Sequence, residues 1–378
     1  MDGPRGDGGS GAIYVWNGGA AFPTGTTTPA SAPRRIVAAT TANWFSGSAI
    51  GWQLATADHD GDGTDDLVAT AVFGNAGGAG AALVFYGGTV PTGTVRISDV
   101  SAAGSGTAVI RMYEEVGFNL FGYYLHNVGP TTGIADPADD LAVGYAEDGV
   151  AGADLKVLRS GGGRPGAAGV TREPFTIGRD VRIHVTTVDT IMEFGSTAAS
   201  IADQNGDGAR DLVLGDYRYN GDVGIVLVID GDTVGTAGVA TITTTGPGAW
   251  GAPVITPLLG SANNQGRGMA VVNNANGTNP DVNGDGNEDL VVASRQAVAG
   301  PAVLEVWFGP LTGFNPSPDH VITGPSSFAA AVPGIGGSPV NAIWAGDVNA
   351  DGLDDVCWAD WTSNSRDGGF QLLWDDGM

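Results

Sequence analysis

The chain of 378 residues contains 64 glycines and 20 prolines, which disfavour long helices and supply turns, while its 42% hydrophobic content suffices for a packed core. Its 41 acidic and 16 basic residues give a net charge of −25, so neither nucleic acid nor an anionic membrane is an expected partner, since both require basic surfaces. No stretch approaches the roughly 18 apolar residues of a membrane span, and the single cysteine, Cys357, cannot form an intramolecular disulfide.

The N-terminal region predicts a short leader followed by an incomplete repeat. Residues 1–10 are glycine-rich and contain no apolar segment of the kind found in secretion signals, so we expect a flexible leader. The stretches "GAIYVWNGG" from Gly11 and "RRIVAAT" from Arg34 are typical of strands. They match the third and fourth strands of the repeats described below, which predicts a partial unit over residues 11–49.

An acidic loop then recurs four times at one spacing. Counted from its first aspartate, positions 1, 3 and 5 are Asp or Asn, position 6 is Gly, position 7 varies and position 9 is Asp. Positions 1, 3, 5, 7 and 9 are Asp58, Asp60, Asp62, Thr64 and Asp66 in loop 1; Asp203, Asn205, Asp207, Ala209 and Asp211 in loop 3; Asp281, Asn283, Asp285, Asn287 and Asp289 in loop 4; and Asp347, Asn349, Asp351, Leu353 and Asp355 in loop 5.

A degraded copy, loop 2, lies between loops 1 and 3. "TTGIADPADDLAVGY" keeps the closing Asp140 but has Thr132 and Ile134 at positions 1 and 3, so we expect it to fold without a metal. The five closing aspartates define a tandem array. The predicted repeats span about 50–120, 121–193, 194–265, 266–338 and 339–378.

Each repeat predicts about four antiparallel strands. An apolar strand precedes the loop, "DLVAT" or a similar run follows it, and a third strand such as "ALVFYGG" comes after a turn. Fourth strands are expected at "TVRIS" near Val95 and "DVRIHV" near Ile183. The predicted fold class is therefore all-β, a single β-propeller over residues 11–378 with five four-stranded blades and an N-terminal half blade.

These motifs resemble the FG-GAP repeat of integrin α-subunit propellers and of many bacterial surface proteins. The resemblance rests on the loop D-x-D-G-D-G-x-x-D-L-V and its flanking strands, with the F-G pair kept at Phe121-Gly122 and Phe194-Gly195. It implies a calcium-stabilised β-propeller, and it does not imply integrin partners.

The loop chemistry independently favours calcium. Ca²⁺ binds six to eight hard oxygens, and the side chains at positions 1, 3, 5 and 9 together with the carbonyl of position 7 can supply them. An EF-hand needs Glu at position 12, where this chain has Ala69, Leu214, Val292 and Trp358, followed by strand rather than helix. We expect about four structural Ca²⁺ sites, and an acidic turn without metal is the alternative.

The predicted function is that of an adhesion, binding or structural module, secreted or displayed at the cell surface. Its expected partner is a protein or a glycan, and the incomplete repeats at both ends favour self-association. The alternative is a carbohydrate-binding or polysaccharide-degrading, lyase-like propeller. We find no catalytic motif, so an enzyme is not expected.

Histidines and aromatic residues give further expectations. The four histidines share no spacing, and His59, inside loop 1, is expected to be solvated. Third-strand tryptophans are expected in the core, whereas aromatic residues of loop-like segments could stack on sugars. The first set is Trp16, Trp307 and Trp374, and the second is Trp44, Trp250, Tyr217 and Tyr219.

Overall fold

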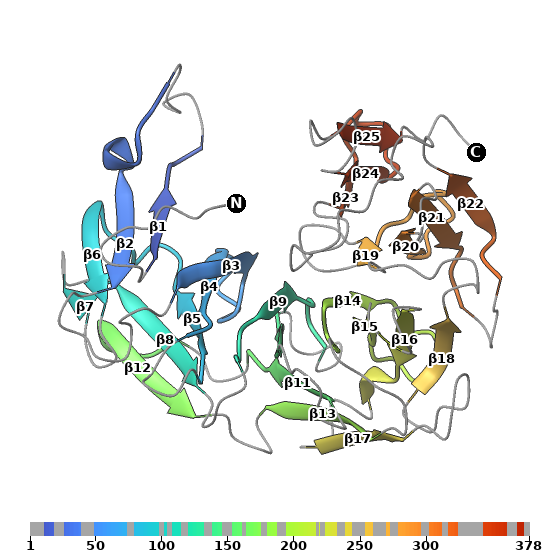
Figure 1. Ribbon diagram of the computed structural model, residues 1–378, viewed down its shortest axis with the longest axis horizontal. Coiled ribbons are helices and arrows are strands. Elements are labelled where there is room, and N and C mark those ends of the chain that lie inside the picture. Colours follow the sequence, from blue (N-terminus) through green and yellow to red (C-terminus); the bar gives the residue numbers. More distant parts are fainter. Residues whose placement is uncertain are drawn as a thin grey trace. The chain divides into compact units, whose positions relative to one another are not determined.

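The computed structural model shows an all-β protein, which confirms the all-β part of the predicted fold class (Figure 1). Helix in the described residues is confined to short turns such as the 3-10 helix η2 (Pro29–Ser31), and none of them is long and apolar enough to cross a membrane. The structure describes residues 11–18, 26–38, 49–73, 79–97, 102–103, 108–114, 120–131, 138–145, 153–160, 164–174, 180–186, 194–216, 219, 224–232, 239–243, 254–259, 270–272, 279–295, 302–311, 317–323, 343–360 and 369–373.

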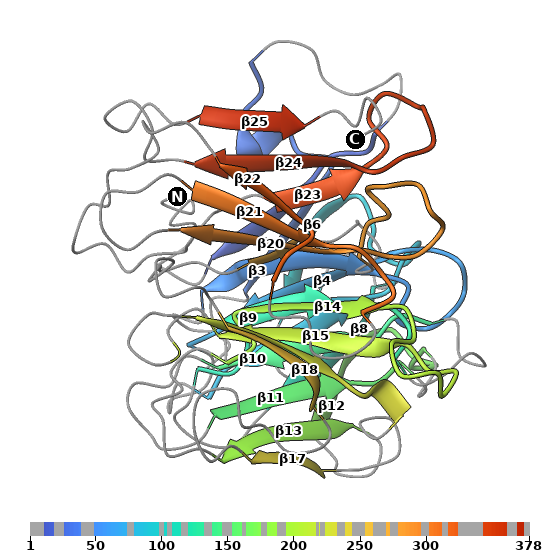
Figure 2. The same cartoon turned by 90° about the vertical axis from the view of Figure 1, so that its right-hand side faces the viewer.

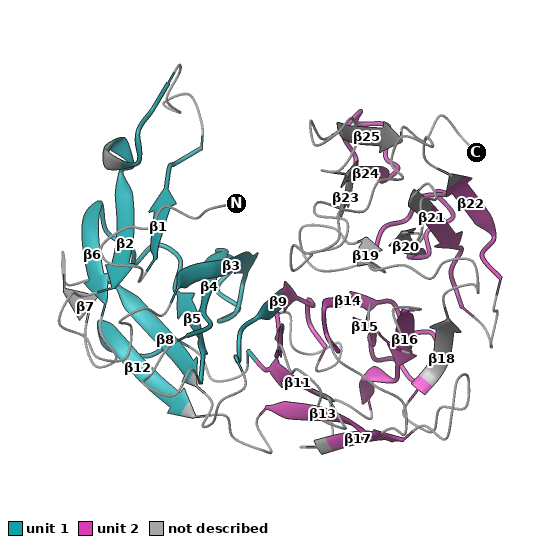
Figure 3. Ribbon diagram, in the orientation of Figure 1, with its two compact units in different colours: residues 1–125, 160–176 teal, residues 126–159, 177–378 magenta. Residues whose placement is uncertain are grey.

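The chain divides into two compact units (Figure 3). Unit 1 comprises Met1–Leu125 and Ser160–Thr176, and unit 2 comprises His126–Arg159 and Ile177–Met378. The predicted leader, residues 1–10, lies outside the described residues. The single propeller domain over 11–378 stays a prediction.

Two sheets contain the described strands of unit 1. The first has the order β12-β8-β5-β4-β3, and the second has the order β1-β2-β6-β7. Their strands are β1 (Ala12–Val15), β2 (Arg34–Ala38), β3 (Ile50–Ala57), β4 (Asp66–Ala71), β5 (Ala81–Phe85), β6 (Gly93–Ile97), β7 (Ala102–Ala103), β8 (Val109–Glu114) and β12 (Gly169–Pro174).

Unit 2 contains four further sheets of described strands, one of them five-stranded with the order β17-β13-β11-β10-β9; its edge strand β9 begins in unit 1 and ends in unit 2. The smaller sheets have the orders β14-β15-β16-β18, β19-β20-β21-β22 and β23-β24-β25. Figure 2 shows β14 and β15 side by side. The strands of these four sheets are β9 (Tyr124–Asn127), β10 (Leu141–Gly144), β11 (Ala153–Leu158), β13 (Val181–Thr186), β14 (Thr197–Ile201), β15 (Asp211–Asp216), β16 (Ile225–Ile229), β17 (Val239–Thr243), β18 (Val254–Leu259), β19 (Ala270–Val272), β20 (Leu290–Arg295), β21 (Ala302–Trp307), β22 (His320–Thr323), β23 (Ile343–Gly346), β24 (Asp355–Asp360) and β25 (Gly369–Leu373).

Three strands leave their own repeat and join the sheet of the preceding repeat, and we call β6, β12 and β17 the exchanged strands. Each follows the third strand of its repeat and pairs in parallel with the outer strand of the preceding sheet: β6 with β2, β12 with β8 and β17 with β13. The chain then returns to its own sheet as β8, β13 or β18. The exchanged strands explain why consecutive repeats are joined by more than their connecting turns.

This exchange corrects one prediction about the fourth strands. "TVRIS" near Val95 belongs to β6 and pairs with β2, so β8 is the outer strand of the first repeat's own sheet. The sequence did not indicate this because a strand of alternating residues fits either sheet equally well, and only tertiary pairing selects one. "DVRIHV" near Ile183 is confirmed as the outer strand β13.

Burial differs from strand to strand. The interior strands β5 and β16 are buried at every residue, whereas β13 alternates between buried and partly exposed positions. Continuous apolar runs suit strands covered on both faces, and alternation suits strands covered on one face. Leu83 and Phe85 lie in the core of unit 1, and Leu227 and Ile229 in the core of unit 2.

These sheets place all four acidic loops at equivalent points. Loops 1, 3, 4 and 5 each connect the first and second strands of a repeat's sheet: β3 to β4, β14 to β15, β19 to β20 and β23 to β24. The residues at position 12 lie in β4, β15, β20 and β24, which confirms that a strand follows each loop and excludes the helix of an EF-hand.

The exchanged strand β17 makes a testable contribution to stability. Ile242 is fully buried in the core of unit 2, whereas its neighbour Thr241 is exposed. We expect Ile242→Ala to lower the free energy of unfolding by about 3 kcal/mol through lost burial and a residual cavity, measured by urea denaturation. Thr241→Ala is the matched control and should cost well under about 1 kcal/mol. Equal, small effects would show that β17 does not pack in this core.

Candidate metal centre

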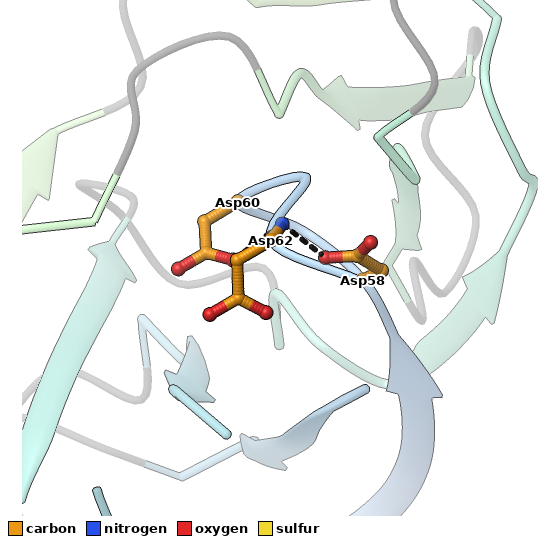
Figure 4. Close-up of side chains that lie close together, drawn as sticks. All are labelled: Asp58, Asp60 and Asp62. Carbon is orange, nitrogen blue, oxygen red and sulfur yellow. Dashed lines mark hydrogen bonds between the residues drawn. The ribbon is translucent and has the colours of Figure 1, made fainter. Parts of the chain in front are cut away.

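Loop 1 brings three carboxylates together between β3 and β4. Asp58, Asp60 and Asp62 each offer one oxygen, and these oxygens all lie within 4.8 Å of one another. Asp58 and Asp60 are half-buried, and Asp62 is exposed. Figure 4 shows the three side chains close together. A group of this kind concentrates negative charge at one point, which favours a cation there.

Backbone N–H groups fix the conformation of loop 1. The amides of Asp62 and Gly63 donate to the two oxygens of Asp58 at 3.0 and 2.9 Å, and the amide of Thr64 donates to Asp62 Oδ1 at 2.9 Å. Gly63 has φ 81°, a left-handed conformation that side chains disfavour, which explains the glycine at position 6. The tight turn points successive carboxylates inward.

The other three loops repeat this geometry. The amide of the position 6 glycine donates to the position 1 aspartate at 2.7 Å in loop 3 and at 3.0 Å in loops 4 and 5. The amide of position 7 donates to the position 5 aspartate at 2.8, 2.8 and 2.9 Å. Identical spacing in the sequence therefore produces the same local fold four times.

The closing aspartate at position 9 has a different environment from the others. Asp66, Asp211, Asp289 and Asp355 are all buried. One oxygen of Asp66 accepts the amide of His59 at 3.2 Å, and the other accepts the amide of Gly87, at the turn after the third strand, at 2.7 Å. The closing aspartate thus fastens the loop to a turn about 20 residues later in the chain.

The same fastening recurs in loops 3 and 4, and it explains a glycine after each third strand. Gly231 donates to Asp211 and Gly309 donates to Asp289, both at 2.9 Å. A Cβ at Gly231 would lie 1.7 Å from the carbonyl oxygen of Arg210, so no other residue fits without a shift of the backbone.

Loop 2 keeps a buried closing aspartate without the acidic cluster. Asp140 is buried, and its Oδ2 accepts the backbone amide of Thr131 at 3.2 Å and the Thr131 hydroxyl at 2.5 Å. Thr132 and Ile134 lie outside the described residues. Retention of Asp140 alone is consistent with a structural role for position 9 that needs no metal.

Burial changes the protonation of the closing aspartates in the metal-free protein. Desolvation raises the pKa of Asp66 to about 7 and the pKa values of Asp211 and Asp289 to about 6, against backbone hydrogen bonds that lower them. The neighbouring aspartates of each loop raise these values further. A cation in the loop would offset both effects by stabilising the ionised form.

The donor set fits a hard cation. Positions 1, 3, 5 and 9 offer carboxylate or amide oxygens, and Ala209 and Leu353 at position 7 have only a backbone carbonyl to offer. Oxygen donors of this kind suit Ca²⁺, Mg²⁺ or Mn²⁺ rather than Zn²⁺ or Cu²⁺, which prefer sulfur and imidazole. The twenty predicted ligand positions all lie within the described residues. Of the five predicted in loop 1, the structure groups the carboxylates of Asp58, Asp60 and Asp62, and Asp66 lies outside this group.

Loop 1 also receives an arginine that the sequence did not indicate. Arg164 Nε lies 2.8 Å from Asp60 Oδ2, and Arg164 Nη2 lies 2.5 Å from Asp62 Oδ2. Arg164 precedes the exchanged strand β12 and is about 100 residues from the loop in the chain. No local sequence signal predicts this contact, because it depends on the exchange of β12.

His59 is buried, so the prediction of a solvated histidine is wrong. Its exposed fraction is 0%, and its Nε2 lies 2.7 Å from the hydroxyl of Tyr113 on β8. The side chain at position 2 of the loop points away from the cation site and toward β8, which explains the difference. His59 therefore connects loop 1 to strand β8.

The division of aromatic residues between the core and accessible loops differs in part from the prediction. Trp307 is buried in the core, as predicted, but Tyr219 is fully buried instead of lying in an accessible loop. Trp16 is half-buried, whereas Trp44, Tyr217, Trp250 and Trp374 lie outside the described residues.

A cluster of partly exposed aromatic residues, not predicted from the sequence, lies in unit 1. Trp52 is 42% exposed and Phe73 is 44% exposed, and their ring centroids are 6.1 Å apart. The centroid of Tyr123 lies 5.2 Å from that of Trp52. Three separate chain segments supply these rings, so sequence spacing could not reveal the cluster.

No family model matches the sequence, and no curated protein shows significant similarity to it. The geometry of the loops therefore carries the functional argument.

The raised pKa values predict an unusual pH dependence in chelator. An aspartate whose folded-state pKa exceeds its unfolded value of 3.8 stabilises the fold most at low pH and loses that contribution as the pH rises through the folded pKa. We expect the melting temperature of the metal-free protein to rise as the pH falls from about 7.5 to about 5.5, the range set by these three aspartates.

Buried His126 opposes this trend, because burial lowers its pKa to about 4 and protonation of the unfolded chain below about pH 6.5 then favours unfolding. Three aspartates against one histidine leave a net rise. The control is the same titration in saturating Ca²⁺, where the rise should disappear. A melting temperature in chelator that falls throughout this range would contradict the assignment.

Proposed function

We propose that the chain is an extracellular, calcium-stabilised β-propeller that serves as an adhesion, binding or structural module of a surface or filament assembly. One observation carries this proposal: four loops share the same hydrogen-bond geometry, and loop 1 gathers three carboxylate oxygens within 4.8 Å. Without a cation, most of this negative charge would be uncompensated in an already acidic chain, because Arg164 offsets only part of it in loop 1.

Calcium is the best-fitting cation. Its flexible coordination accepts carboxylate, amide and carbonyl oxygens together, whereas Mg²⁺ requires near-ideal octahedral geometry. The backbone amide of Asn287 lowers the pKa of Asp285, which keeps this ligand position ionised at neutral pH. Exposed loops of this kind suit the high calcium concentration outside the cell, where modules bind with affinities of about 10⁻⁴ to 10⁻³ M.

The contacts among the loops of unit 2 support a propeller. Arg210 of loop 3 forms an ion pair with Glu288 of loop 4 at 2.6 Å, and the amide of Asp354 in loop 5 donates to the carbonyl of Asp281 in loop 4 at 3.2 Å. Equivalent loops of consecutive sheets therefore touch one another. Radially packed blades bring equivalent turns together in this way.

A structural role for the metals fits better than catalysis. Four equivalent loops provide no single special site, and a catalytic metal needs an open coordination position for substrate. We therefore assign recognition to the faces of the sheets and stability to the loops. The expected partner is a protein, a glycan or another copy of the chain, and the net charge of −25 disfavours nucleic acid.

Calcium titration tests this proposal. We expect the decalcified protein to bind about four Ca²⁺ by isothermal titration calorimetry and to melt well below the calcium-loaded protein, because a ligand that binds only the folded state stabilises it. Asp58→Ala should remove one site. Asp65→Ala is the matched control, since it removes an equal charge from position 8 of the same loop without removing a predicted ligand. Absence of binding, or an unchanged melting temperature in EDTA, would refute the calcium assignment.

The aromatic cluster favours a second candidate function, carbohydrate binding. Trp52, Phe73 and Tyr123 present ring faces and edges, with neighbouring centroids no more than 6.1 Å apart, and two of them are more than 40% exposed. Rigid aromatic side chains supply large contact area with little entropy loss on binding. A polysaccharide-degrading enzyme would need catalytic groups beside this cluster as well.

A glycan-binding assay distinguishes this candidate. If the cluster binds sugar, Trp52→Ala should weaken binding on a glycan array by about tenfold or more, the effect of losing one aromatic anchor. Leu54→Ala is the control, because Leu54 lies on the same strand and is 53% exposed. Equal binding by both variants and the parent would assign the cluster another role.

A further inference from the structure

Loops 3, 4 and 5 share a contact that loop 1 cannot make by itself. The position 3 asparagine donates its Nδ2 to Oδ2 of the position 5 aspartate at 3.0 Å in loop 3, 3.1 Å in loop 4 and 2.8 Å in loop 5. The Oδ1 of the same asparagine accepts the backbone amide of position 5 in each loop. One side chain thus both shapes the turn and supports the position 5 carboxylate.

Loop 1 has Asp60 at position 3, and an ionised carboxylate has no hydrogen to donate. Asp60 Oδ1 still accepts the amide of Asp62 at 3.3 Å, so the acceptor half of the asparagine contact is preserved. The donor half comes from Arg164. Its Nη2 binds Asp62 Oδ2, the atom that the asparagine amide binds in the other loops, and its Nε binds Asp60 Oδ2.

The guanidinium also equalises the charge of the loops. Positions 1, 3 and 5 carry three carboxylates in loop 1 and two in each of loops 3, 4 and 5. The positive charge of Arg164 offsets the additional carboxylate of Asp60. Loop 1 therefore offers a cation about the same local charge as the other loops.

Contacts with Tyr86 and Gly87 also hold the Arg164 side chain in place. Its guanidinium carbon lies 5.6 Å from the ring centroid of the buried Tyr86, and its Nη2 lies 3.4 Å from the carbonyl oxygen of Gly87. Gly87 is also the residue whose amide binds the closing Asp66. Stacking of a guanidinium on an aromatic ring together with paired carboxylate contacts gives a specific geometry.

The exchanged segment is fastened at both ends. Arg164 precedes β12 and binds loop 1, and Glu173 near the end of β12 forms an ion pair with Arg111 of β8 at 3.3 Å. Parallel pairing of β12 with β8 connects the two contacts. The segment Ser160–Thr176 belongs to unit 1 although the rest of its repeat lies largely in unit 2.

We propose that Arg164 replaces the missing asparagine amide of loop 1 and thereby fastens the exchanged strand β12 to the first cation site. The site differs from the other three in being completed by a residue of the following repeat. This role rests on the proposed function for its calcium-related part, whereas the contact itself operates with or without a metal. A cation in loop 1 and the guanidinium then repel each other, so this site binds calcium more weakly than it would without Arg164.

A double-mutant cycle between Arg164 and Asp60 tests the proposal. In EDTA, Arg164→Ala should lower the melting temperature by several degrees, and Asp60→Asn should change it little. In the Asp60→Asn background, Arg164→Ala should have a much smaller effect, since the introduced amide can donate to Asp62 as in the other loops. Arg172→Ala, which removes an exposed positive charge from β12, is the control and should have a small effect in both backgrounds.

Two further readouts separate this role from simple packing. Hydrogen exchange of the β12 amides, residues 169–174, should accelerate in Arg164→Ala and return toward the parent rate in the double variant. Calcium affinity of one site should increase several-fold in Arg164→Ala, and this gain should be lost in the double variant.

Additive effects of the two substitutions in EDTA would overturn the proposal, as would unchanged exchange of β12 in Arg164→Ala. If the protein binds no calcium at all, the proposed function fails while the cycle in EDTA still decides the role of Arg164. Unchanged or weaker calcium binding in Arg164→Ala, with four sites present, would overturn the inferred repulsion.

Discussion

The buried closing aspartate is the interaction on which the rest of the structure depends. Its carboxylate accepts one amide from its own loop and one from the turn after the third strand, as Asp66 does with His59 and Gly87. One side chain thereby connects the loop between the first and second strands with the turn after the third strand. An unpaired amide in this place would cost about as much as a lost hydrogen bond. Even in loop 2, which lacks the acidic cluster, the closing Asp140 accepts an amide of its own loop, that of Thr131.

The acidic positions 1, 3 and 5 lie in the same loop that the closing aspartate holds in place. Positions 1 and 5 accept backbone amides of the same turn in all four loops, which keeps their carboxylates in one turn and concentrates negative charge at four places. The proposed calcium ions would relieve that repulsion and the desolvation of the closing aspartates at once. Stability and calcium binding are then linked, and the surfaces between the loops are left for recognition.

Exchanged strands add a second level of connection. Because β6, β12 and β17 pair with the preceding sheet, each of these repeats contributes to a neighbour's sheet as well as to its own. The contact of Arg164 with loop 1 follows from this arrangement. Repeats joined in this way exchange both main-chain hydrogen bonds and charged side chains, which favours a cooperative array over independent modules.

Local chemistry in the sequence determined the all-β class, the number of acidic loops, the glycine at position 6 and the strand after each loop. These features depend on residues within about ten positions of each other, where spacing, turn conformation and alternation act directly. Tertiary structure alone decided the sheet that β6 joins, the burial of His59 and Tyr219, the aromatic cluster around Trp52 and the contact of Arg164 with Asp60 and Asp62. Each of these depends on segments distant in the chain, and a strand or charged side chain carries no local mark of the partner it will meet.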